Sequence, residues 1–78
     1  MGEAKKIDRV LDLSGMLGPN PSLITRKRLG DLVRGETLEV ICSERSVRKA
    51  ILALCRNSLY EVIETREENG LSSFIIRK

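Results

Sequence analysis

The sequence predicts one α+β domain, a two-layer sandwich whose elements follow the order β-α-β-α-β-β. Residues 47–55 repeat apolar side chains at helical spacing, between segments with the alternating pattern of strands. Near the C-terminus, Asn69 and Gly70 form the dipeptide most typical of a tight β-hairpin. Because strand–helix–strand units favour parallel strands with right-handed crossovers, both helices should cover one face of a mixed four-stranded sheet.

The first half of the chain contains a strand, a turn and a helix. Residues 1–5 are a polar tail, so the single domain spans residues 6–78. Residues 6–13 form the first strand, with apolar side chains on both faces. A helix is expected from residue 19 to about Val33, and Gly35 should follow its last residue, where a left-handed conformation is common.

The second half begins with a strand at residues 37–42, after which Ser43 or Ser46 should cap the second helix. A third strand is expected at residues 59–65 and a fourth at residues 73–77, on either side of the hairpin turn. The apolar stripe of the second helix has five members: Val47, Ala50, Ile51, Leu54 and Cys55.

Composition excludes several classes of function. The 78 residues carry a net charge of +3 and contain no histidine, which removes histidine-based catalysis and most zinc sites. We therefore expect no metal and no cofactor. The weak charge, with one Tyr, one Phe and no Trp, argues against nucleic acid as a partner. No apolar run could span a bilayer and the first residues do not resemble a secretory signal, so we expect a cytoplasmic protein without membrane contact.

The turn between the first strand and the first helix is the most specific stretch of the sequence. Residues 12–21, here called the joint, read Asp-Leu-Ser-Gly-Met-Leu-Gly-Pro-Asn-Pro. Proline suits the first helical position, so we predict Pro19 there and Gly18 as the N-cap. The free N–H groups of such a terminus would hold an anion, or lower the pKa of a thiol.

Several side chains of the first helix lie off its apolar stripe. Leu23 and Ile24 are most simply interpreted as packing against a nearby loop, and the alternative is an apolar collar for a partner. The basic run at residues 26–28 is typical of a solvated helix face, with a binding patch as its alternative.

From about residue 10 to residue 78, the sequence resembles the TusA/SirA family of small sulfur carriers. Members of this family have an Asp near the end of the first strand, a Gly three residues later, and Cys-Pro-x-Pro at the start of the helix. The matching residues here are Asp12, Gly15, Gly18-Pro19-Asn20-Pro21, Arg26-Lys27, Gly35-Glu36-Thr37-Leu38 and Phe74-Ile75-Ile76-Arg77-Lys78. The resemblance implies the sheet order 1-2-4-3.

The resemblance also implies sulfur relay through contacts with partner proteins. In the family, the motif cysteine carries sulfur as a persulfide, but Gly18 occupies that position here. Whether the chain is an enzyme is therefore open, and persulfide chemistry is not expected at the usual site. Candidate residues for binding a partner or an anion are Asn20, Arg26 and Lys27.

The sequence retains two thiols. Cys55 lies on the stripe of the second helix, which indicates a core position. Cys42 ends a strand just before a helix N-terminus, so it is either a buried residue facing the helices or a displaced sulfur site. Spacing along the second helix keeps the two cysteines too far apart for a disulfide.

Three functional hypotheses follow. The first is a TusA/SirA-like protein that acts in sulfur relay or its regulation through protein contacts. The alternatives are a module that binds an anion or small ligand at residues 18–20, and a module that binds RNA.

Overall fold

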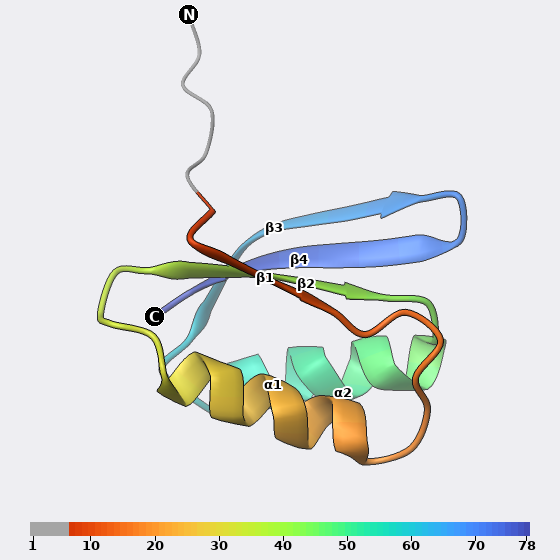
Figure 1. The fold of residues 1–78 in the computed structure, drawn as a ribbon, viewed down its shortest axis with the longest axis horizontal. Helices are drawn as coiled ribbons and strands as arrows, with labels where there is room; N and C mark the ends of the chain where they lie inside the picture. The colour runs from red at the N-terminus through yellow and green to blue at the C-terminus, as the bar shows by residue number, and fades with distance from the viewer. Residues whose placement is uncertain (1–6) are drawn as a thin grey trace, which may run out of the picture.

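A computed structural model of the chain describes residues 7–78. Figure 1 shows a four-stranded sheet with both helices against one of its faces. The elements are β1 (Arg9–Asp12), α1 (Asn20–Gly30), β2 (Thr37–Cys42), α2 (Arg45–Arg56), β3 (Glu61–Glu68) and β4 (Leu71–Arg77). The sheet order is β1-β2-β4-β3. The predicted two-layer sandwich and its strand order are therefore confirmed.

Strand pairing places the ends of distant segments at one edge of the sheet. β1 pairs with β2 in parallel, and β4 runs antiparallel to both β2 and β3. Asn69 and Gly70 make the β3–β4 turn with φ of 52° and 80°, the positive values that a two-residue hairpin turn of this type requires. The C-terminal ends of β1 and β2 consequently lie at the same edge as this hairpin (Figure 1).

The core lies between the sheet and the two helices. β2 directs its alternate side chains, Leu38, Val40 and Cys42, into this layer, where each is at most 1% exposed. The other buried apolar residues of this cluster are Leu13, Leu29, Leu32, Val47, Ile51, Cys55, Phe74 and Ile76. The stripe predicted for α2 is confirmed at Val47, Ile51 and Cys55, whereas Leu54 is half-buried and Ala50 is exposed.

The first helix is shorter than predicted. α1 ends at Gly30, and the N–H of Asp31 then donates to the carbonyls of Lys27 and Arg28, both at 3.2 Å. The turn that follows buries Leu32 but leaves Val33 68% exposed. The prediction that this helix extends to about Val33 was therefore wrong, because apolar residues at helical spacing continue past the point where the chain leaves the helix.

The strand boundaries also differ from those predicted. β3 begins at Glu61, and Leu59, the predicted first residue, lies outside the sheet and is 97% exposed. The hairpin pairing extends to Glu68 opposite Leu71, so both strands are longer at the turn end than predicted. β1 starts at Arg9, and the polar tail predicted at residues 1–5 lies outside the described residues. Within residues 7–78, neither helix is long and apolar enough to cross a membrane.

Candidate functional site

The joint lies at the sheet edge where β1 and β2 end. Its first residues continue the parallel pairing, since the N–H of Leu13 donates to the carbonyl of Ile41 at 2.7 Å. The chain then leaves the sheet and returns as α1, which packs under it (Figure 1). The joint therefore faces the loop between β2 and α2.

Asp12 fixes the first turn of the joint. Its carboxylate accepts hydrogen bonds from the N–H of Ser14 at 2.9 Å and from its hydroxyl at 2.7 Å. These two bonds stabilise the charged form and lower the pKa of Asp12, although its side chain is exposed. Asp12 thus has a structural role in closing the turn.

Gly15 connects the joint to the loop after β2. Its φ of +83° suits glycine, and its N–H donates to Oγ of Ser43 at 2.8 Å. The predicted capping of α2 by Ser43 or Ser46 was therefore wrong. Glu44 is the N-cap residue, without a side-chain capping bond, and the Ser43 hydroxyl accepts the N–H of Gly15.

Gly18 precedes the N-cap of α1. Pro19 is the N-cap residue and Asn20 begins the helix, so the predicted N-cap at Gly18 was wrong by one position. Gly18 has φ of +84°, and a Cβ built on it would meet no atom within 4 Å. The position is open to solvent, and its backbone conformation is one that L-residues rarely adopt.

The two prolines limit what the start of α1 can bind. Pro19 and Pro21 have no N–H, and the N–H of Leu23 donates to the carbonyl of Pro19 at 3.3 Å. Asn20 and Ser22 are left as the backbone N–H donors of the first turn. This helix terminus therefore has fewer free N–H groups for binding an anion than the sequence suggested. Pro21 is instead buried in the core, where its carbonyl accepts a bond of 2.8 Å from Oγ1 of Thr25.

Apolar and basic side chains close to Gly18 in the sequence are exposed. Leu17 is 63% exposed and Leu23 is 56% exposed, so both apolar side chains are accessible to solvent. The predicted packing of Leu23 against a loop was therefore wrong, whereas Ile24 packs against the core cluster. The remaining binding candidates, Asn20, Arg26 and Lys27, are all exposed on α1.

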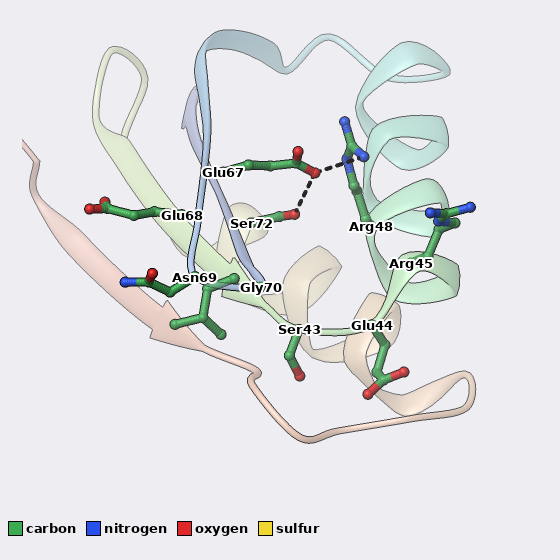
Figure 2. A pocket seen from close by; sticks show the side chains of 10 residues that line it. Ser43, Glu44, Arg45, Arg48, Glu67, Glu68, Asn69, Gly70 and Ser72 are labelled. Carbon is green, nitrogen blue, oxygen red and sulfur yellow. Dashed lines mark hydrogen bonds and ion pairs between the residues drawn. The ribbon is translucent and has the colours of Figure 1, made fainter.

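A hollow of about 400 Å³ lies at the same sheet edge, between α2 and the β3–β4 hairpin. Figure 2 shows Glu67 directed toward α2, where Arg48 holds it in an ion pair of 3.0 Å. The hydroxyl of Ser72 also donates to Glu67, at 3.3 Å. Ser43 lines the hollow as well, so one residue belongs to both the hollow and the joint. Reasoning from the sequence missed this arrangement, because it depends on pairing between distant strands.

Both thiols of the chain lie in the core. Cys42 is 1% exposed and Cys55 is 4% exposed, and both are free thiols. Burial raises the pKa of both, and at Cys42 the nearby Arg48 charge offsets only part of this effect. The interpretation of Cys42 as a buried strand residue is confirmed. No group of three metal-ligating side chains occurs within residues 7–78.

Comparisons with known proteins agree with this architecture. Residues 9–78 match the family described as sulfurtransferase TusA. The sulfur carrier protein TusA of Pseudomonas paraeruginosa is 33% identical over 72 residues, which are 92% of this chain and 91% of that protein. A TusA protein of Allochromatium vinosum is 34% identical over 71 residues, covering 91% of this chain and 93% of that protein.

A solved structure gives the same result for the fold. The crystal structure of a SirA-like protein from Desulfitobacterium hafniense superposes with a TM-score of 0.78 at 21% identity. The match covers 88% of this chain and 95% of that one. Because the family match spans nearly the whole described sheet and both helices, this chain belongs to the TusA family of sulfur carriers.

Proposed function

We propose that this chain acts in sulfur relay, or in its regulation, by binding the partner proteins of a relay without carrying sulfur at position 18. The observation that carries the proposal is Gly18 itself. It occupies the place where the family's motif has a cysteine, and glycine has no atom that could hold a persulfide. Its φ of +84° also favours glycine over any residue with a side chain.

The remaining thiols support the same proposal. A persulfide carrier needs a thiolate that a partner can reach. Cys42 and Cys55 are buried, and burial raises the pKa of each, so the neutral thiol is favoured. Cys42 would need the sheet edge to open before it could receive sulfur.

The surface around Gly18 is suited to protein contact. Leu17, just before it in the sequence, and Leu23, on the first turns of α1, expose apolar side chains, and Arg26 and Lys27 add positive charge about one helical turn after Leu23. Apolar anchors beside basic residues are typical of protein–protein interfaces. We infer that a relay partner docks here, with Asn20 at the centre of the contact.

A competition assay tests this function. A cysteine desulfurase is allowed to load sulfur onto a TusA protein that has the motif cysteine, with increasing amounts of this chain added. We expect the chain to slow loading, because it occupies the desulfurase surface without accepting sulfur. Leu23→Lys should relieve the inhibition, while Val33→Lys, which changes an exposed apolar residue far along the chain from the joint, should not. Loading that is unaffected by excess chain would contradict the proposal.

A further inference from the structure

The face of the sheet opposite the helices is uncovered among the described residues (Figure 1). Strand register assigns alternate residues to this open face, including Val10, Glu39, Ile41 and Ser73. Val10 is 60% exposed, and Leu71, at the hairpin end of the same face, is 41% exposed. The sheet therefore presents a second surface that neither helix uses.

Charge on the open face has the opposite sign to that of the whole chain. Register places five carboxylates and two guanidinium groups there: Asp12, Glu39, Glu61, Glu64 and Glu68 with Arg66 and Arg77. Both arginines pair within the face, Arg66 with Glu64 at 2.9 Å and Arg77 with Glu61 at 2.6 Å. The open face is therefore acidic, although the net charge of the chain is +3.

The helix layer carries the compensating positive charge. Its exposed side chains include seven basic residues: Arg26, Lys27, Arg28, Arg34, Arg45, Lys49 and Arg56. The acidic residues of the same helices and turns are Asp31, Glu36 and Glu44, and Glu67 of β3 also points to this side (Figure 2). The helix side thus has a net positive charge and the open face a net negative charge, and such an asymmetry selects partners by charge.

The acidic face contains a hollow of about 410 Å³, large enough to receive a side chain of a partner. The apolar residues Ile41 and Leu71 line it together with Glu39 and Glu68. Arg66 also lines it, and its charge is paired with Glu64. Figure 2 shows Glu68 on the side of β3 away from α2, opposite in direction to Glu67. Neither Glu39 nor Glu68 takes part in an ion pair within residues 7–78, so both carboxylates can accept an incoming cation.

We propose that this open face docks a basic segment of a partner protein, in which lysine or arginine side chains flank an aliphatic one. The cations would meet Glu39 and Glu68, and the aliphatic side chain would enter the hollow over Ile41 and Leu71. Opposite charges at such a surface steer association and set specificity. Nucleic acids and anionic membranes are repelled by the same carboxylates. The open face and the helix side can hold two partners at once, which would make the chain an adaptor.

An NMR titration tests the proposal without any sulfur chemistry, so its outcome is independent of the function proposed for the joint. The probe is an acetylated Lys-Val-Lys-Leu-Lys amide, added to the ¹⁵N-labelled chain at low salt. We expect shifts at the amides of Glu39, Ile41, Leu71 and Ser73, which weaken as salt is added. The matched peptide with Glu in place of Lys should produce none.

Charge reversal provides the control. Glu39→Lys should weaken binding of the probe about tenfold, as expected for a lost charge contact at an interface. Glu68→Lys should act in the same direction, which covers the case in which one variant folds poorly. Asp31→Lys, the same change on an exposed carboxylate of the helix side, should leave the affinity unchanged. Equal weakening by Asp31→Lys, or shifts confined to the helices, would overturn the proposal.

Sedimentation of the chain alone tests a second copy as the occupant. The basic helix side of one copy complements the open face of another, so self-association is the competing explanation. We expect a monomer at the concentrations used for the titration. Association that rises with concentration and disappears in Glu39→Lys would overturn the proposal in favour of self-assembly.

Discussion

The N–H of Gly15 donates a hydrogen bond of 2.8 Å to Oγ of Ser43 and so ties the joint to the loop between β2 and α2. Ser43→Ala removes the acceptor and should lower the free energy of unfolding by about 0.5–1 kcal/mol, the usual range for one hydrogen bond near the surface. Urea unfolding measures this change, and amide exchange at Gly15 should become faster. Ser46→Ala, an exposed serine of α2, is the control and should have a smaller effect. An equal change in the free energy of unfolding for the two variants would mean that the hydrogen bond between Gly15 and Ser43 does not contribute to stability.

A side chain at position 18 should lower stability because of backbone strain, although there is space for it. Gly18 has φ of +84°, so Gly18→Ala should lower the free energy of unfolding by about 1–2 kcal/mol even though a Cβ meets no neighbour. Gly30, the last residue of α1, has open space around it and no positive φ. Gly30→Ala should therefore stabilise the chain by about 0.5 kcal/mol. Thermal or urea unfolding compares the pair, and stabilisation by both substitutions would refute the conformational argument.

The core of α2 should dominate stability. Ile51 is 0% exposed between α2 and the sheet, so Ile51→Ala should cost about 2–5 kcal/mol. That is a large share of what a domain of this size possesses. Lys49→Ala, on the exposed face of the same helix, should change stability by less than about 0.5 kcal/mol. Urea unfolding measures the difference in stability between the two variants. Similar values for both would mean that α2 turns a different face toward the core.

The lowered pKa of Asp12 gives a pH dependence with a defined sign. Because its carboxylate is stabilised by Ser14 in the folded state, its contribution is present at neutral pH. The contribution is lost as pH falls through the folded-state pKa, below the usual value for Asp. Asp12→Asn should therefore be less stable than the parent at neutral pH, and the difference should shrink in acid. A difference that stays constant down to low pH would contradict this assignment.

The fold was predictable because local signals agree with one another. The apolar residues Val47, Ala50, Ile51, Leu54 and Cys55 recur at i, i+3, i+4, i+7 and i+8, which fits a helix and not a strand, and Asn69 with Gly70 is typical of a tight turn. The joint was also predictable from the sequence, because two prolines and two glycines within ten residues are typical of a turn that leads into a helix. Each of these features depends on neighbours in the chain, which a sequence displays directly.

Other features depend on contacts between distant residues. The bond between Gly15 and Ser43 joins positions 28 apart, and it exists because β1 and β2 are parallel neighbours. The apolar spacing through Val33 fits a longer helix, yet the chain turns at Gly30. The exposure of Leu23 and the charge of the open face likewise follow from packing and register. Sequence periodicity contains none of this information.

Sulfur uptake tests the central claim most directly. The parent, Cys42→Ser and Gly18→Cys are each incubated with a cysteine desulfurase and ³⁵S-labelled cysteine, and label is measured on the intact chain. We predict no label on the parent or on Cys42→Ser. Gly18→Cys should take up label because its new thiol is exposed beside the start of α1, where the pKa of a thiol falls below its usual value. Label on the parent that disappears in Cys42→Ser would contradict the account and make Cys42 the carrier.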